Sequence, residues 1–400
     1  MPRTLWVLTA GQFINRFGSF VYPFLALYLS DHGYGMGQVA TVIGALAVGN
    51  IAAPFASGYL ADGIGRRNTI VISLVGGAIT MLGLYFCQNQ AQLIVMAVLH
   101  GFFANMFGPA ANALMSDVVP PEKRVTAYAI FRLALNGGFA AGPAVAGFFY
   151  IRSPWLIFVG DALTTLIFAG LAYGLLPHGL RTIKGNLSSA KVAWQSWWAA
   201  GADLVRNRPF AQLLLANFLM SIAFAQIFNI LSLDATARGL SPVDYGIVMG
   251  FNGLIIMLVE LPLAQWIKRY PSKRILTWGY GLVGLGCASF FWADSLATFL
   301  VAMAIFTLGE MVSLPVSAAY GAELAPEEFR GRYFGFFGLS WGAAALVGSS
   351  GVWFYGLMGA NWWLWTGIFG GLASVVMVTR VWSRKVVHVS PVTSEESPLP

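Results

Sequence analysis

Long apolar runs separated by short polar breaks make up almost the whole chain. A helix needs roughly 20 apolar residues to cross the hydrocarbon core of a bilayer, and these runs are about that long. The pattern therefore predicts an all-α membrane protein with twelve membrane-spanning helices. They are expected at residues 5–29, 37–60, 69–88, 91–116, 125–150, 153–176, 210–233, 243–266, 275–293, 295–320, 333–356 and 362–383.

Composition agrees with a chain that lies mostly in lipid. Hydrophobic residues make up 58% of it and charged residues 10%, whereas soluble domains carry about 25% charged residues. Two packed soluble α-domains are excluded, because their helices would show polar faces. Cys87 and Cys287 both fall inside apolar runs, so no disulfide framework is expected.

The basic residues of the loops are divided very unequally between the two sides of the predicted membrane. One side holds nineteen of them, counting the termini and the long middle stretch, and the other holds only Arg152 and Arg238. Loops rich in Lys and Arg face the cytoplasm. Both termini are therefore predicted to be cytoplasmic, in a multi-pass protein of a bacterial inner membrane. The net charge of +7 is then a topology signal, and no nucleic-acid partner is expected.

Four regions follow from these breaks. Residues 1–176 and 210–385 are predicted to be six-helix halves, residues 177–209 a cytoplasmic linker, and residues 386–400 a disordered tail without apolar periodicity. Within the linker, the stretch "KVAWQSWWAAGADLVRNR" mixes tryptophans with basic residues. That mixture is typical of a helix lying at the membrane surface, although a simple tether is an equally good interpretation.

The two halves carry an internal repeat. The loop "DVVPPEKR" (117–124) matches "ELAPEEFR" (323–330) at an offset of 206 residues, and the same offset pairs Gly142 with Gly348 in the helix that follows. A repeat that runs through a loop and into the next helix indicates a duplicated six-helix unit. Many secondary transporters have this architecture.

The stretch "GYLADGIGRR" (58–67) interrupts two apolar runs with glycines, one acid and two arginines. Glycines permit a tight turn, and Asp62 can sit against a helix N-terminus or an arginine. At the 206-residue offset, Lys268 replaces Asp62. Arginines that only orient the protein would not explain the acid or the glycines. We therefore predict that Asp62 and Arg66 form a conformational latch.

This stretch resembles the signature loop of the major facilitator superfamily, G-x-L-x-D-x-x-G-R-R. The resemblance covers nearly the whole chain, because the helix number, the repeat and the predicted termini also fit. It implies a major facilitator fold, with two six-helix halves that rock around a central site. It also implies a gate on the cytoplasmic side, formed by Gly58, Asp62, Gly65, Arg66 and Arg67.

The run at 125–150 resembles the motif of the antiporters of this superfamily, especially drug:proton exporters. Gly138, Gly142, Pro143 and Gly147 fill the motif, and Ala146 departs from it. Small residues four apart let helices approach closely, and proline bends a helix. In the family this helix packs on the eighth one and seals the outer side. The alternative is that Gly and Pro are simply common in membrane helices.

A second departure lies in the fourth predicted helix. Ala97 stands where such exporters carry an arginine implicated in proton transfer, so this chain lacks the usual residue for the step. Ionisable groups inside a bilayer are costly and face a cavity or a partner. Six lie away from the ends of the predicted helices: Arg16, His100, Arg132, Asp161, Glu260 and Glu310.

Arg132 and Asp161 lie in neighbouring helices, so an ion pair between them is expected. Asn136 follows Arg132 by one helical turn on the same face. Arg16 is in a helix that lines the central cavity in this family. Arg16, Arg132 and Asn136 are therefore the candidates for contact with a substrate. His100 is interpreted as a packed polar residue.

The three acids are the candidates for proton coupling. Glu310 leads, because it lies mid-membrane with no cation near it in sequence, and a carboxyl group removed from water favours its protonated form. A neutral structural role for Glu310 is the alternative. Glu260 is equally well interpreted as a gate carboxylate or as a partner for loop arginines. Asp161 is the next candidate if Glu310 proves structural.

These patterns favour a monomeric secondary transporter that uses protons to export amphipathic small molecules, with an adaptable apolar cavity built from aromatic and Met-rich helices. A proton-coupled symporter that imports a nutrient or peptide is the alternative within transport. A membrane enzyme or sensor fits poorly, since the sequence shows no nucleophile–base pair, no metal-binding cluster and no signalling domain. No cofactor is expected.

Overall fold

The computed structural model describes residues 1–120, 123–178, 190–267, 269–326 and 329–379, in which all regular elements are helices. They are α1 (Arg3–Phe17), α2 (Val21–Asp31), α3 (Met36–Gly63), α4 (Arg66–Tyr85), α5 (Gln90–Val118), α6 (Arg124–Arg152), α7 (Trp155–Leu175), α8 (Ala190–Arg206), α9 (Arg208–Asn229), α10 (Leu231–Ala237), α11 (Pro242–Ile267), α12 (Ser272–Ser289), the short 3₁₀ turn η2 (Phe290–Trp292), α13 (Leu296–Leu324), α14 (Arg330–Ser349), α15 (Gly351–Met358), the turn η4 (Gly359–Asn361) and α16 (Trp362–Val378).

Each predicted membrane segment coincides with one helix or with consecutive helical pieces. Ten stretches of the described chain are long and apolar enough to cross a membrane. One of them, Arg332–Val378, combines the last two predicted segments. The first predicted segment is instead split into α1 and α2, of 15 and 11 residues. The all-α membrane fold is confirmed, whereas the number twelve stays a prediction.

The first segment of each half is interrupted at a similar place. In the first half α1 ends at Phe17 and α2 begins at Val21. In the second half α9 ends at Asn229 and α10 begins at Leu231. A helix end leaves backbone N–H and C=O groups without helical partners, and inside a membrane these groups need protein partners. The first break uses a side chain of another helix, since Asp161 of α7 accepts the N–H of Val21. The second keeps backbone hydrogen bonds from Ile230 to Gln226 and from Asp234 to Ile230.

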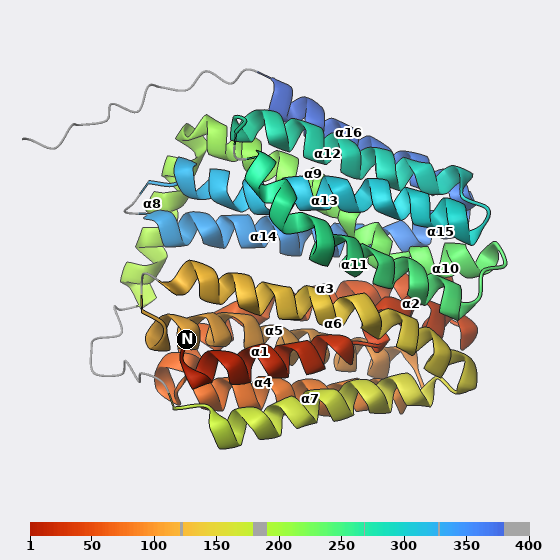
Figure 1. Ribbon diagram of the computed structural model, residues 1–400, viewed down its shortest axis with the longest axis horizontal. Helices are drawn as coiled ribbons and strands as arrows, with labels where there is room; N and C mark the ends of the chain where they lie inside the picture. Colours follow the sequence, from red (N-terminus) through yellow and green to blue (C-terminus); the bar gives the residue numbers. More distant parts are fainter. Residues whose placement is uncertain (121–122, 179–189, 268, 327–328, 380–400) are drawn as a thin grey trace, which may run out of the picture.

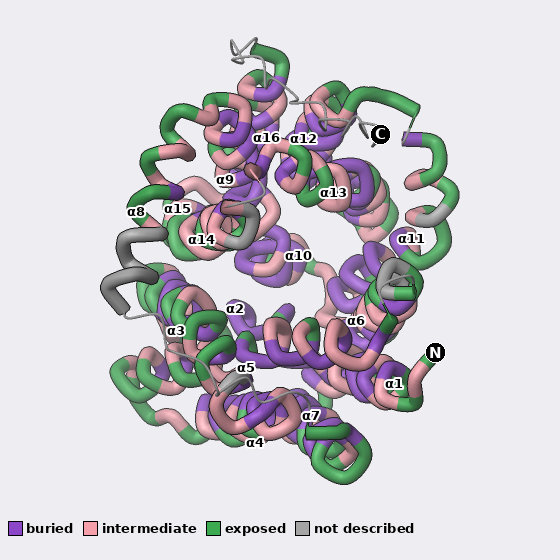
Figure 2. Tube along the Cα trace, turned by 90° about the vertical axis from the view of Figure 1, so that its left-hand side faces the viewer, coloured by how far each residue is buried: buried purple, intermediate pink, exposed green. Residues whose placement is uncertain are grey.

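The helices lie in two groups that correspond to the two halves of the chain. In Figure 1 the helices α1–α7 form the lower group and α9–α16 the upper one, with the N-terminus at the left and α2, α10 and α15 toward the right. Figure 2 shows the molecule from the end that carries the N-terminus, with α2 and α10 facing each other between the groups. We call the opposite end the α2–α10 end.

The two halves are packed together at the α2–α10 end. Tyr245 of α11 donates a hydrogen bond from its hydroxyl to the carbonyl oxygen of Pro23, at 2.8 Å. The ring of Tyr245 also packs edge-on against Phe24, with 4.9 Å between centroids. Tyr22 packs against Phe228 of α9 at 5.3 Å. We call these contacts of Tyr22, Pro23 and Phe24 the α2 seal.

The linker helix α8 packs on the second half. Trp197 meets Phe336 of α14 edge-on at 5.3 Å, and the hydroxyl of Tyr333 donates a hydrogen bond to Asp203. The predicted segment is thus helical, while its position at the membrane surface stays a prediction. The predicted tail at 386–400 lies outside the described residues.

Candidate functional site

The loop between α3 and α4 contains the first predicted site. Gly65 precedes α4 with φ +97°, a left-handed conformation that favours glycine, so the backbone itself explains this glycine. Arg66 forms an ion pair with Asp117 of α5, at 3.5 Å. The guanidinium of Arg67 lies over the ring of Tyr173, 5.2 Å from its centroid. Added at Gly58, a Cβ would meet no atom within 4 Å. The side chain of Asp62 lies outside the described part, so the latch stays a prediction.

The glycine motif of α6 faces two different helices. Gly138 and Gly142 lie against α1, where an added Cβ would overlap the carbonyl oxygens of Phe13 and Phe17. Gly147 instead lies against the backbone of Pro242 at the start of α11. The carbonyl of Pro143 approaches Gly246 of α11 equally closely. The motif therefore permits close packing with α1 inside the first half and with α11 across the halves.

Nearer the start of α6, an ion pair connects the two halves. The guanidinium of Arg132 pairs with the carboxylate of Glu260 in α11. Asn136 donates a hydrogen bond to the second carboxylate oxygen, at 3.5 Å. The side chain of Arg132 is 46% exposed and that of Glu260 is 17% exposed. The ion pair therefore joins a half-exposed guanidinium to a largely buried carboxylate.

This geometry corrects two expectations. The predicted pair of Arg132 with Asp161 is wrong, because α7 packs mainly against α4 and α1 while Arg132 reaches α11. Glu260 has an arginine partner, as one of its two interpretations required, but that partner comes from a helix of the opposite half rather than from a loop.

Glu310 lies beside this ion pair. Its carboxylate accepts a hydrogen bond from the amide of Asn252 in α11, at 2.8 Å, and the same amide donates to Thr307 at 2.9 Å. Arg132 and Glu260 are both close enough to interact with Glu310 electrostatically. We call Arg132, Asn136, Asn252, Glu260 and Glu310 the cross-half cluster. It combines two acids and one arginine at the contact between the halves.

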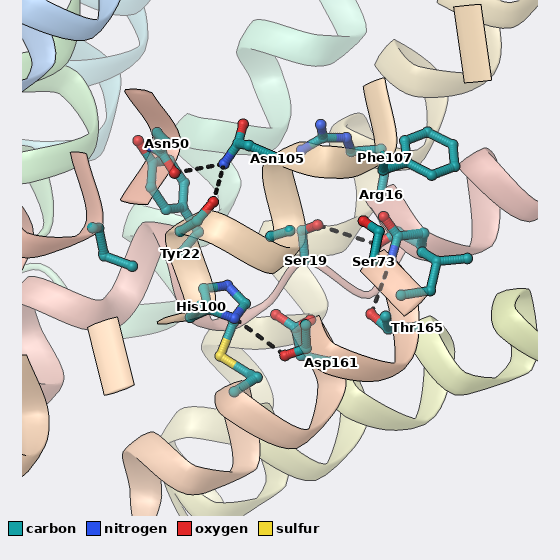
Figure 3. Close-up of a pocket in the computed structure, with 17 residues that line it drawn as sticks. Arg16, Ser19, Tyr22, Asn50, Ser73, His100, Asn105, Phe107, Asp161 and Thr165 are labelled. Carbon is teal, nitrogen blue, oxygen red and sulfur yellow. Dashed lines mark hydrogen bonds between the residues drawn. The ribbon is translucent and has the colours of Figure 1, made fainter. Parts of the chain in front are cut away.

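A separate cavity of about 320 Å³ lies within the first half, and Figure 3 shows its polar lining. Arg16, Asp161 and His100 contribute ionisable groups to it, and Asn50 and Asn105 contribute amides. His100 is packed between two helices as expected, with Nδ1 at 3.1 Å from the carbonyl oxygen of Gly77. Arg16 therefore lines a cavity, but all residues lining that cavity belong to the first half.

Asp161 lies at the edge of this cavity, next to the break between α1 and α2. It is 7% exposed, and its carboxylate accepts a hydrogen bond from the backbone N–H of Val21 at 3.3 Å. Arg16 interacts with it electrostatically. Among the described residues, no ion pair within 4 Å joins Arg16 to Asp161. The partner that Asp161 takes in this structure is thus the first backbone N–H of α2.

Sequence reasoning missed two buried polar residues. Asn252 is an amide inside an apolar run, "MGFNGLIIM", and this was a signal that it needs a partner. Asp234 lies in α10 and is 1% exposed, directly after the apolar run predicted at 210–233. No group of three His, Cys, Asp or Glu side chains in the described part of the chain could hold a metal ion.

Comparison with known proteins decides the family. The sequence profile of the Major Facilitator Superfamily matches residues 8–349 and, in a second match, residues 235–398. The chain belongs to the major facilitator superfamily. It is therefore a multi-pass membrane transporter and not an enzyme.

Individual relatives are similar over different lengths. A Na⁺, Li⁺, K⁺/H⁺ antiporter of Planococcus maritimus is 27% identical over 83% of this chain and 84% of its own. The multi-drug resistance efflux pump PmrA of Streptococcus pneumoniae is 37% identical over 36% of this chain and 38% of its own. The crystal structure of the nucleoside transporter NupG has a TM-score of 0.79 at 15% identity, covering 94% of this chain and 99% of NupG. This last likeness concerns the fold alone.

Proposed function

We propose that this transporter exports amphipathic small molecules in exchange for protons, by alternating access. The observation that carries the proposal is the cross-half cluster, in which Glu310 lies beside an ion pair that joins the halves. Two of the relatives are a cation/proton antiporter and a multi-drug efflux pump, which supports this direction of transport and protons as the coupled ion.

Glu310 is the proposed proton-coupling group. When it is ionised, two carboxylates share the one arginine of the cluster, which favours binding a proton or a cationic part of the substrate. A bound proton removes that preference, so the proton and the substrate compete. Because Glu260 and Arg132 belong to opposite halves, competition at this place can change how the halves fit together. Arg16, Arg132 and Asn136 are proposed to contact the substrate.

The test is transport by the purified protein in proteoliposomes, with pH gradients of either sign. Glu310→Gln should lose gradient-driven transport while it still binds substrate with an affinity that no longer depends on pH. Glu260→Gln should impair coupling less. Asp294→Asn, which alters an exposed acid, serves as the matched control. Substrate accumulation against its gradient by Glu310→Gln would contradict the role of Glu310.

The same assay separates export from the alternative, a proton-coupled importer of a nutrient or peptide. An antiporter moves substrate and protons in opposite directions, so a vesicle that is acidic inside should accumulate substrate. A symporter would accumulate it under the opposite gradient. The close packing of α6 on α11 through Gly147 and Gly246 supports the antiporter, since it matches the helix pair of the antiporter motif.

The α3–α4 loop is proposed as the gate on the cytoplasmic side. Asp62→Asn should slow transport strongly and leave substrate affinity within a few-fold, because it shifts a population without touching a ligand. Arg66 pairs with Asp117 of α5, so one partner of this loop lies within the first half. Normal turnover of Asp62→Asn at normal expression would contradict the latch.

The proposed setting is a monomer in a bacterial inner membrane, with both termini in the cytoplasm. In a chain that lacks Cys87 and Cys287, Ala237→Cys should react with an impermeant thiol reagent added outside cells. Trp198→Cys in α8 should not react. Both side chains are exposed in the structure, so the comparison reports orientation. The reverse labelling pattern would overturn it.

A further inference from the structure

The break between α1 and α2 is enclosed by one face of α7. An added Cβ at Gly18 would overlap the side chain of Thr164, so α7 approaches the break closely. Thr165 accepts a hydrogen bond from the amide of Asn15, at 2.9 Å. Asp161 accepts the N–H of Val21 at 3.3 Å. Residues 161, 164 and 165 are spaced so that they lie on one face of a helix. That face holds the end of α1 and the start of α2.

The N-terminal end of α2 has no side-chain cap from the residue that precedes it. Its N-cap residue, Phe20, makes no side-chain capping hydrogen bond. The N-terminus of a helix carries a partial positive charge and free N–H groups, which favour an anion. Asp161 supplies that anion, and it comes from a helix 140 residues later in the chain.

The α2 seal begins one residue after this contact. Tyr22 packs on Phe228 of the second half. Pro23 accepts the hydroxyl hydrogen bond of Tyr245, and Phe24 packs on the ring of Tyr245. Phe24 and Tyr245 are fully buried. The start of α2 is therefore held by Asp161 on one side and joins the two halves on the other.

Few charged or titratable groups face Asp161 from the helices around it. Arg16 of α1, Tyr22 of α2 and His100 of α5 share the cavity with it. From α3 and α4 come only uncharged lining side chains, among them Asn50 and Ser73. A change in the charge of Asp161 would thus act on Arg16 and on the start of α2.

We propose that Asp161 is a positioning residue that couples protonation to the α2 seal. As a carboxylate, it holds the N-terminus of α2 through a charge-assisted hydrogen bond, which is roughly twice as strong as a neutral one. When Asp161 takes up a proton, this hydrogen bond and the favourable helix-terminus interaction both weaken. The start of α2 is released, and the halves separate at the α2–α10 end. The inference rests on the proposed proton-driven function and adds a second place where a proton acts.

The test is a distance measurement across the α2–α10 end. Spin labels are placed at Gln88→Cys in the first half and Ala237→Cys in the second, both exposed positions, in the full-length chain without Cys87 and Cys287. Pulsed electron paramagnetic resonance then gives the distance distribution at pH 8 and pH 5. With Asp161 present, acidification should at least double the population at longer distance.

Two variants decide where the proton acts. Asp161→Asn should show the longer distance at both pH values, and Asp161→Glu, which keeps the carboxylate, should restore the response to pH. A response of Asp161→Asn equal to that of the unaltered chain would overturn the inference. If Asp161→Asn fails to fold, the labelled parent still decides, because a distribution that is identical at pH 5 and pH 8 also overturns it.

Glu310→Gln separates this inference from the proposed function. In the same labelled chain it should keep the response to pH, since the measurement needs neither substrate nor transport. Loss of the response in Glu310→Gln with retention in Asp161→Asn would contradict the role of Asp161 and leave proton coupling at Glu310 intact. A failure of Glu310→Gln to alter transport would, in turn, leave the distance result unaffected.

Discussion

The two broken segments of this protein are interrupted at similar places, and the side chains beside the two breaks differ in chemistry. In the second half, the amides of Gln226 and Asn229 at the end of α9 both donate to the carbonyl oxygen of Gly348 in α14, at 3.0 and 3.2 Å. In the first half, a carboxylate of α7 accepts the N–H of Val21 at the start of α2. One break is thus held by neutral donors and the other by an acid.

Each half also has a buried aspartate near its break, and the two differ in how they are satisfied. Asp234 accepts hydrogen bonds from Tyr355 at 3.0 Å and from Trp363 at 2.9 Å. It also pairs with Arg238 at 2.9 Å. Asp161 accepts hydrogen bonds from backbone N–H groups alone, those of Val21 and Phe20, with Arg16 nearby as the counter-charge. A fully bonded buried charge stabilises one arrangement, whereas a charge with few donors can change its state at lower cost.

The largest expected effect concerns the two aspartates. Asp234→Asn should lower the free energy of unfolding by about 3 kcal/mol, because the partly buried Arg238 loses its carboxylate partner and the new NH₂ group faces other donors. Asp161→Asn should cost about 1 kcal/mol, since it replaces a charge-assisted hydrogen bond to the N–H of Val21 by a weaker neutral one. Chemical unfolding followed by tryptophan fluorescence measures both. Equal losses would erase the difference between the halves.

A smaller effect is expected at the repeated glycines Gly142 and Gly348, which lie against the end of α1 and of α9. At Gly142 an added Cβ would overlap the backbone carbonyl of Phe17, which cannot move alone. At Gly348 it would meet Ala225 Cβ at 3.0 Å and the Gln226 amide at 3.2 Å. Gly142→Ala should therefore cost about 1–3 kcal/mol and Gly348→Ala less.

Thermal unfolding of the two glycine variants gives this comparison directly. Gly170→Ala is the control, because an added Cβ there meets no atom within 4 Å. If Gly348→Ala is the more damaging variant, the first break is not the more tightly enclosed of the two.

The smallest effect tests whether an acid can make the second break sensitive to pH. Asn229→Asp replaces a donor to Gly348 by a carboxylate, which can donate only when it is protonated. The variant should lose about 1 kcal/mol of stability at pH 8 and recover most of it at pH 5. Unfolding at both pH values, each relative to the unaltered chain, measures the difference. The same loss at pH 5 and pH 8 would show that protonation does not matter at this break.

Sequence patterns predicted the helices better than their interruptions. The apolar run at 5–29 has the length of a membrane helix, and the glycine and serine at its break also occur in continuous membrane helices. At the break, Asp161 accepts the N–H of Val21 and Thr164 packs against Gly18. A partner that far along the chain leaves no trace in the local pattern.

The site was predictable in its residue types but not in its pairs. Charged groups inside a membrane are costly and face a cavity or a partner. This singled out Arg132, Asp161, Glu260 and Glu310. Their partners depend on how each helix is rotated about its axis, which a short apolar run does not specify. Hence Asp161, the acid of the next predicted helix, was the wrong partner for Arg132, and the acid of α11 was the right one.

The attachment of α8 to α14 makes the two halves unequal as separable pieces. Trp197 covers Gly335 and packs on Phe336, and Asn207, directly after α8, donates to the carbonyl oxygen of Leu324 at 2.9 Å. A chain divided between Leu175 and Ala190 would leave α8 on the fragment it contacts. A chain divided after Arg206 would instead separate α8 from that fragment and expose the apolar surface of α14 that α8 covers. Co-expressed fragments should therefore reassemble from the first division more completely than from the second.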